Sequence, residues 1–295
     1  MAQVEASDVA TAGAISHNAA MTRRFVSFCI AHGILLLGAA FVLLPFVWMI
    51  ATSIKPPNEI FSENLRLFPN QFYGYENYSF ALEHAPLLRF ALNGIIVCVG
   101  ILIVQLLIAI PCAYALAKLR FPGSNLLFTL ILLALAIPIQ VPALPLYIGL
   151  AWVGQLNTYF SLMLPFFLSA FAIFLFRQFF RGFPEDIINA ARLDGMSEFE
   201  IVWRIVTPSA VPAIAAFSVF SIVAHWNDLY WPLIVVSDND LATPPLGMLI
   251  FADAETGSNY GALTAAATIL TAPLVLCFLI ARRRFIQGIT MTGVK

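Results

Sequence analysis

The sequence has little charge. Only 11% of its 295 residues are Asp, Glu, Lys or Arg, and the formal net charge is −1. A soluble domain has about 25% charged residues, so this composition argues against a water-soluble protein. The near-zero net charge also gives no positive field that would attract a phosphate backbone. We therefore expect no nucleic-acid partner.

Lysine is scarce and catalytic motifs are absent. The three lysines are Lys55, Lys118 and Lys295, and none follows the glycine-rich loop of a Walker A motif. The sequence has no HExxH zinc motif and no nucleophile elbow, which are patterns that would indicate a membrane enzyme. Its four cysteines lack the spacing of metal ligands. We expect a non-catalytic chain that binds neither a metal nor a cofactor.

Long apolar runs dominate instead, and 61% of the residues are hydrophobic. A helix needs about 20 apolar residues to cross a hydrocarbon core of about 30 Å. The predicted fold is an all-α polytopic membrane protein with six transmembrane helices, at Phe25–Ala51, Leu88–Leu116, Leu126–Leu150, Thr158–Phe180, Thr207–Val236 and Leu263–Ala281. Prolines interrupt the third run, which fits either a kinked packing helix or a helix that lines a pathway.

The basic residues orient these spans. Of 15 lysines and arginines, only Lys55, Arg66 and Arg89 fall on the side opposite to the termini. Because basic loops stay inside the cell, both termini are predicted to be cytoplasmic. The predicted organisation is a disordered N-terminus rich in Ala, Ser and Thr, a transmembrane domain and a cytoplasmic tail, over residues 1–22, 23–287 and 288–295.

Residues 181–206 form a charged segment between the fourth and fifth apolar runs. Pro184 can begin a helix, and Gly195 can end it in the left-handed conformation. Ser197 and Glu200 have the spacing of a capping box, which begins a second helix. We expect two short helices joined by a glycine bend.

The second of these helices has an apolar side, formed by Ile201, Val202 and Ile205, and is expected to end before Pro208. A bare connection between packed helices needs only about 2–8 residues, far fewer than this segment holds. An apolar face in water favours a docking surface for a partner over a simple connector.

The segment PEDIINAARLDGMSEFEIVWRIVTPSAVPA resembles the EAA loop of ABC-importer permeases. Four further segments resemble the maltose-type permeases, the inner-membrane components of carbohydrate importers that depend on a binding protein. They are AYALAKLRFPG (Ala113–Gly123), PLYIGLAWVGQLNTY (Pro145–Tyr159), WNDLYWPLIV (Trp226–Val235) and GITMTGVK (Gly288–Lys295). The similarity covers nearly all of the chain after residue 22, and the shared order of the segments makes it specific.

The resemblance implies the type I importer fold in a bacterial inner membrane and a sugar or sugar-like substrate. It implies that loop 181–206 docks on a dimer of a separate ATPase, which binds and hydrolyses ATP with Mg. It also implies a homologous second permease that completes the pathway and an extracytoplasmic solute-binding protein that delivers the substrate. The ATPase-coupling residues implied by the resemblance are Glu185, Asn189, Ala190, Ala191, Asp194, Gly195, Met196 and Glu198.

Asn189 departs from the family pattern, in which this position is a glutamate that pairs with a basic residue of the ATPase. An amide accepts a hydrogen bond but cannot form an ion pair. Either the second permease supplies the glutamate, or Glu185 or Asp186 of this chain replaces it.

Aromatic and polar residues in or near the spans are candidates for the substrate pathway. They are Trp226, Asn227, Asp228, Tyr230, Gln105 and Gln140. Aromatic rings stack on the apolar face of a sugar, while amides and carboxylates bind its hydroxyl groups. The same residue types also form interfacial belts and interhelical hydrogen bonds, and that alternative stays open.

An ion-coupled secondary transporter of a small polar solute is the alternative function. It needs ionisable residues at membrane depth, and only His225 and Asp228 come close. It also leaves the capped hairpin unexplained. A channel has less support, because no segment resembles a selectivity filter.

Overall fold

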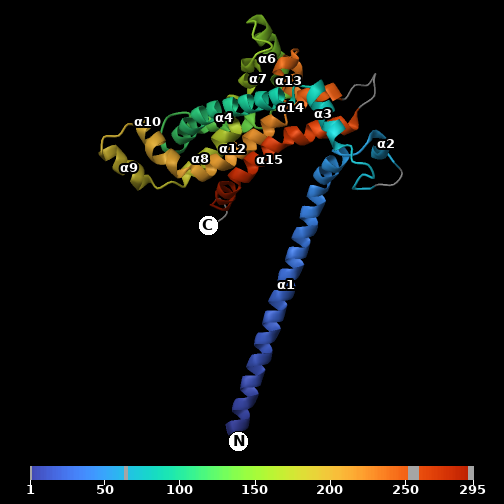
Figure 1. The fold of residues 1–295 in the computed structure, drawn as a ribbon. Helices are drawn as coiled ribbons and strands as arrows, with labels where there is room; N and C mark the ends of the chain where they lie inside the picture. Colours follow the sequence, from blue (N-terminus) through green and yellow to red (C-terminus); the bar gives the residue numbers. More distant parts are fainter. Residues whose placement is uncertain (1, 63–65, 252–258, 292–295) are drawn as a thin grey trace.

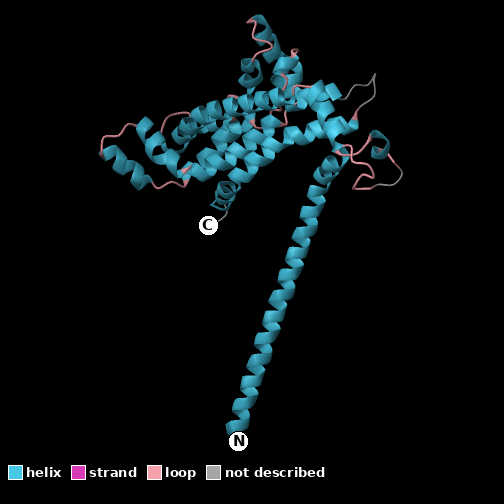
Figure 2. Cartoon of the chain, viewed as in Figure 1, coloured by secondary structure: helices cyan, strands magenta, loops and turns pink. Residues whose placement is uncertain are grey.

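The computed structural model describes residues 2–62, 66–251 and 259–291. Every regular element in these ranges is a helix, which confirms the all-α prediction (Figure 1, Figure 2). The α-helices are α1 (Ala2–Ser53), α2 (Pro57–Ile60), α3 (Gly74–His84), α4 (Leu87–Lys118), α5 (Ser124–Ala134), α6 (Gln140–Trp152), α7 (Tyr159–Met163), α8 (Ala170–Arg181), α9 (Glu185–Leu193), α10 (Glu198–Ile201), α11 (Thr207–Ser209), α12 (Val211–Trp226), α13 (Tyr230–Val235), α14 (Pro244–Met248) and α15 (Tyr260–Met291). The π-helical turn is η2 (Val202–Val206), and the 3-10 segments are η1 (Leu164–Phe166), η3 (Asn239–Leu241) and η4 (Leu249–Phe251).

Three described helices are long and apolar enough to cross a membrane: Val26–Ser53, Leu87–Lys118 and Tyr260–Ile280. Two bent pairs could each form one further span, which raises the number to five. The pairs are Tyr159–Phe166 with Ala170–Arg181, bent by 48°, and Glu198–Ser209 with Val211–Trp226, bent by 80°. The count of six spans and the cytoplasmic position of both termini stay predictions.

Prolines break three of the expected spans. The interruption of the third was predicted, whereas the prediction of continuous helices for the fourth and fifth was wrong. The third, Leu126–Leu150, is divided into α5 and α6 around Pro138. The fourth, Thr158–Phe180, is interrupted by η1, which contains Pro165. A proline inside a helix has no N–H to donate, and its ring clashes with the carbonyl four residues earlier. Each break follows from that lost hydrogen bond.

The fifth expected span, Thr207–Val236, is broken twice. It bends sharply at Ala210, between α11 and α12, with Pro208 and Pro212 on either side. It then ends as a helix at Trp226, and the short α13 follows. The continuous part of this span is therefore only α12.

The N-terminus differs from its expected state. The structure places residues 2–22 in the first turns of α1, whereas we expected disorder. Alanine is the strongest helix former, and this segment is rich in it. The C-terminal tail was expected at residues 288–295. Its first part, to Met291, belongs to α15, and the remaining tail lies outside the described residues.

Helices α4, α8, α12 and α15 lie side by side and form the body of the molecule (Figure 1). The core at one end contains Tyr114, Phe176, Phe180 and Phe217, which are at most 2% exposed. These side chains come from α4, α8 and α12. Their close packing fixes the C-terminal end of α4, beside which α9 and α10 project.

A large apolar surface remains uncovered. Helix α1 extends away from the body (Figure 1), and most of its described apolar side chains before Ile50 are exposed. Leu126 and Leu133 on α5 and Trp152 on α6 are exposed as well. Soluble monomers rarely have patches of this extent. The surface fits contact with lipid or with another membrane chain.

Candidate functional site

The charged hairpin of α9 and α10 projects from one end of the body, while α3 and α14 lie at the other end (Figure 1). Its first helix begins after Pro184, as predicted, with Glu185 and Asp186 in the first turn. Carboxylates there interact favourably with the positive end of the helix dipole. The second helix begins at Ser197 with a complete capping box to Glu200, which confirms that prediction.

The bend between the two helices depends on Gly195, whose φ is +82°. Two backbone hydrogen bonds close it: the N–H of Gly195 donates to the Arg192 carbonyl (3.1 Å), and the N–H of Met196 donates to the Ala191 carbonyl (3.1 Å). This pair of bonds is the Schellman arrangement, which glycine favours because it has no Cβ. The predicted glycine bend is confirmed.

The second helix does not end before Pro208, and that expectation was wrong. It continues through η2 and α11 as far as Ser209. Pro208 has no N–H to donate. The turn before it is the π-helical turn η2, in which the N–H of Thr207 donates to the Val202 carbonyl five residues earlier. The Thr207 hydroxyl donates to the same carbonyl (2.7 Å). The chain therefore changes direction after the proline instead of before it.

The apolar side of the second helix is covered by the chain itself. Ile201 is fully buried and Val202 is 3% exposed. Both join Ile188 and Ala191 of α9 in the core around the end of α4. We expected this side to be a free docking face. The structure corrects that expectation, because burying these side chains is what anchors the hairpin to the body.

The most exposed apolar side chains of the hairpin lie at its tip instead. Leu193 ends α9 and is 89% exposed, and Phe199 in α10 is 70% exposed. Asp194 and Gly195, between them, are exposed as well. Sequence reasoning missed Leu193 and Phe199. Their signal was that they fall outside the helical spacing of the buried residues Ile188, Ala191 and Ile201.

Hydrogen bonds tie both helices of the hairpin to α4. The Tyr114 hydroxyl donates to Glu198 Oε2 (2.6 Å), and Arg192 Nε donates to Glu198 Oε1 (2.6 Å). Arg192 Nη1 also donates to Asn189 Oδ1 (3.1 Å). The bond from Arg192 lowers the pKa of Glu198, so this carboxylate is ionised at neutral pH. We call these four residues the polar strap.

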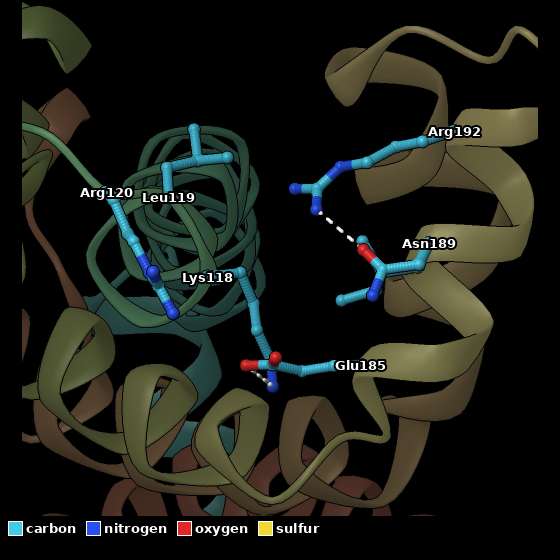
Figure 3. Close-up of a pocket in the computed structure, with 7 residues that line it drawn as sticks. Lys118, Leu119, Arg120, Glu185, Asn189 and Arg192 are labelled. Atoms are coloured by element: carbon cyan, nitrogen blue, oxygen red, sulfur yellow. Dashed lines mark hydrogen bonds and ion pairs between the residues drawn. The ribbon is translucent and has the colours of Figure 1, made fainter.

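A second anchor lies at the start of the hairpin. Lys118 is the last residue of α4, and its side chain is only 5% exposed. Its Nζ donates to the Phe183 carbonyl (2.7 Å) and lies 3.9 Å from Glu185 Oε1 (Figure 3). Glu185 therefore faces a cation of its own chain, although its side chain is 72% exposed.

The expected coupling residues form one continuous region but differ in access. Glu185, Asn189, Ala190, Asp194 and Gly195 are exposed, Met196 and Glu198 are half-buried, and Ala191 is buried. The buried alanine packs in the core around the end of α4. Direct contact with a partner is therefore open to the exposed members and to the tip.

Residues 105–291, more than half of the chain, match a family described as "Binding-protein-dependent transport system inner membrane component". The chain belongs to this family. The permease is 32% identical, over 89% of its length and 96% of the relative's, to the arabinooligosaccharides transport system permease protein AraQ of Halalkalibacterium halodurans. It is also 32% identical to the diacetylchitobiose uptake system permease protein NgcG of Streptomyces coelicolor, over 92% and 90% of the two chains. The sn-glycerol-3-phosphate transport system permease protein UgpE of Brucella abortus has the same identity, over 92% and 98%.

A solved structure shares the fold. The permease matches a chain from the crystal structure of a bacterial ABC transporter involved in the import of the acidic polysaccharide alginate, with a TM-score of 0.76. The match covers 88% of the permease and 96% of that chain at 21% identity. The predicted type I ABC importer permease fold is thereby confirmed.

Two of the pathway candidates in the permease are packed inside it. Gln105 of α4 accepts a hydrogen bond from the Ser221 hydroxyl (2.7 Å), and its Nε2 donates to the Phe166 carbonyl (2.8 Å). Trp226 is 5% exposed, and its ring lies close to Gly94 on α4. Both residues connect α4 to neighbouring helices of the permease.

The other four candidates are more accessible. Asn227, Tyr230 and Gln140 are exposed. Asp228 is half-buried and accepts a hydrogen bond from the N–H of Tyr230 (3.0 Å). Apart from this bond between Tyr230 and Asp228, no hydrogen bond joins two of the six candidates within the part of the chain that the structure describes. A pathway role for these residues stays a prediction.

Proposed function

We propose that the permease is one of two that form the translocation pathway of an ATP-driven importer, and that its hairpin docks on a separate ATPase. The observation that carries the proposal is the tip of the hairpin. Leu193 and Phe199 are exposed there on a base that buried side chains and the polar strap hold in place. A partner can bind a rigidly held apolar tip, and the hairpin can then transmit the movement of that partner to the spans.

We propose a sugar or sugar-like solute as the cargo. The named cargoes of the three relatives are arabinooligosaccharides, diacetylchitobiose and sn-glycerol-3-phosphate. They share several hydroxyl groups, which suits a site of amide, carboxylate and aromatic groups. Asn227, Asp228 and Tyr230 remain our candidates for that contact, ahead of the packed Gln105 and Trp226.

The geometry supports the following surroundings for the permease. In a bacterial inner membrane the hairpin faces the cytoplasm, and the end that holds α3 and α14 faces the solute-binding protein. The exposed apolar faces of α1, α5 and α6 are left for lipid and the second permease. The chain itself binds no cofactor in this proposal, because ATP and Mg are bound by the ATPase.

Co-purification tests the assembly. The permease is tagged in its native host, extracted in mild detergent and analysed by mass spectrometry. We expect one homologous permease, two copies of an ATPase, and solute uptake by the reconstituted complex that needs ATP and persists with ionophores. A chain that purifies alone and transports solute in liposomes along an ion gradient would instead be a secondary carrier.

The polar strap gives a prediction about coupling. Tyr114→Phe removes the hydroxyl that joins α4 to Glu198, a hydrogen bond to a charged group that contributes about 1.5–3 kcal/mol. We expect the ATPase to remain bound, because Leu193 and Phe199 are unchanged. The ATP hydrolysed per solute imported, measured in proteoliposomes, should rise about fivefold.

The matched control is Tyr159→Phe. It removes a hydroxyl bond of equal length, 2.6 Å, from Tyr159 to Asn93 Oδ1. That bond joins α7 to α4 and does not involve the hairpin. An equal rise in both variants, or no rise in Tyr114→Phe, would show that the strap does not transmit movement.

A further inference from the structure

A basic cavity lies between the end of α4 and α9, and docking of the hairpin tip does not involve it. Its volume is about 390 Å³, within the range of about 300–1,000 Å³ that is usual for sites of small ligands. The lining residues are Lys118, Leu119, Arg120, Glu185, Ile188, Asn189 and Arg192. In Figure 3, Lys118 and Arg120 lie on one side of the cavity, and Asn189 and Arg192 lie on the other.

The cavity has an excess of positive charge. Lys118, Arg120 and Arg192 line it, and Glu185 is the one carboxylate among its lining residues. Glu185 Oε1 is 3.9 Å from Lys118 Nζ, which is beyond hydrogen-bond distance. The buried ammonium group donates one bond, to the Phe183 carbonyl, but has three protons to donate. It therefore keeps donors for another acceptor.

The two arginines also keep free donors. Arg120 is exposed, and it has no hydrogen bond or ion pair to any residue that the structure describes. Arg192 uses Nε for Glu198 and Nη1 for Asn189, which leaves its other terminal nitrogen available. A guanidinium group matches the geometry of phosphate oxygens. Three cations with unused donors around one cavity indicate an anionic ligand.

We propose that this cavity binds a phosphate group, held by Lys118, Arg120 and Arg192. The last residue of α4, Lys118, marks the end of a candidate membrane span, and phospholipid headgroups lie at that depth. Basic pockets between spans at the cytoplasmic side bind anionic headgroups, and the half-buried apolar side chain of Leu119 suits the adjoining lipid. The phosphate belongs to a phospholipid or is free in solution, and the chemistry of the site is the same.

Thermal unfolding of the purified complex tests the proposal, because a ligand that binds only the folded state raises the Tm by an amount that grows with the ratio of its concentration to its Kd. The delipidated complex is titrated with phosphatidylglycerol or phosphatidylcholine in mixed micelles. It is titrated separately with sodium phosphate against sodium chloride at equal ionic strength. We expect phosphatidylglycerol to raise the Tm and phosphatidylcholine to leave it unchanged. Arg120→Gln should weaken the apparent affinity about tenfold, and Arg120→Lys should restore most of it.

Arg181→Gln is the matched control. It removes the same charge from an exposed arginine at the same end of the molecule, outside the lining of the cavity. A phosphatidylglycerol effect that Arg120→Gln weakens and Arg181→Gln retains supports a lipid headgroup. An Arg120-dependent effect of phosphate alone supports the free anion. Equal responses of the wild type and Arg120→Gln, or no response of the wild type to either probe, would overturn the proposal.

Discussion

Replacing Leu193 and Phe199 together by aspartate is expected to release the ATPase from the complex and to abolish ATP-dependent uptake. Both side chains are exposed at the tip of the hairpin, 89% and 70% respectively. Side chains that become buried at the centre of an interface contribute about 2 kcal/mol or more each to the binding free energy. In the variant, two carboxylates would instead lose their water on docking, which weakens binding further. The measurement is the amount of ATPase that co-purifies with the tagged permease.

Tyr75→Asp is the control for this pair of changes. Tyr75 is 79% exposed and lies on α3, at the opposite end of the body. Tyr75→Asp adds one carboxylate, where the double variant adds two, to an exposed aromatic position, and the ATPase should remain bound. The second permease should be retained in both variants, because neither changes a span. Retention of the ATPase by the double variant would place the docking surface elsewhere on the chain.

Changing Gly195 to proline should have an effect of similar size. Proline requires a φ near −65°, whereas Gly195 has a φ of +82°. The substitution also removes the N–H that donates to the Arg192 carbonyl. The turn cannot then close, so Leu193 and Phe199 lose their relative position. We expect loss of the ATPase from the purified complex without loss of the second permease.

Gly195→Ala gives the graded form of the same test. A left-handed conformation costs an L-residue about 1–2 kcal/mol, so ATPase binding should weaken without disappearing. Gly182→Ala is the matched change, because the φ of Gly182 is −81° and an added Cβ there meets only ordinary contacts. If the alanine variants behaved alike, the left-handed turn would have no part in docking.

Local signals in the sequence predicted the parts of the hairpin that depend on local chemistry. A capping box and a left-handed glycine are set by residues within one or two turns, so Ser197, Glu200 and Gly195 were placed correctly. The spans were predicted less well, because hydropathy detects an apolar run but not the geometry of its backbone. Pro165 shows the difference, since the apolar composition continues across it while the helix does not.

Local signals could not predict which side chains of the hairpin are buried against the body and which are exposed. Ile201 and Val202 form an apolar stripe that in sequence looks free to dock, and only the three-dimensional contact with the end of α4 shows that it is occupied. Tyr114 and Glu198 are 84 residues apart, and no local rule pairs them. Long-range contacts of this kind decide which side chains of the hairpin remain for a partner.

The hydrogen bond from Gln105 to the Phe166 carbonyl has a consequence for membrane insertion of the chain during its synthesis. Phe166 lies at the break between α7 and α8, where a carbonyl left without a donor in lipid costs several kcal/mol. The donor belongs to α4, which precedes the break in the chain and leaves the ribosome first. We therefore expect α4, once it is in the membrane, to assist insertion of the broken helix by supplying this donor. We expect a variant that lacks Gln105 to be degraded as a partly inserted chain during synthesis, before it can transport any solute.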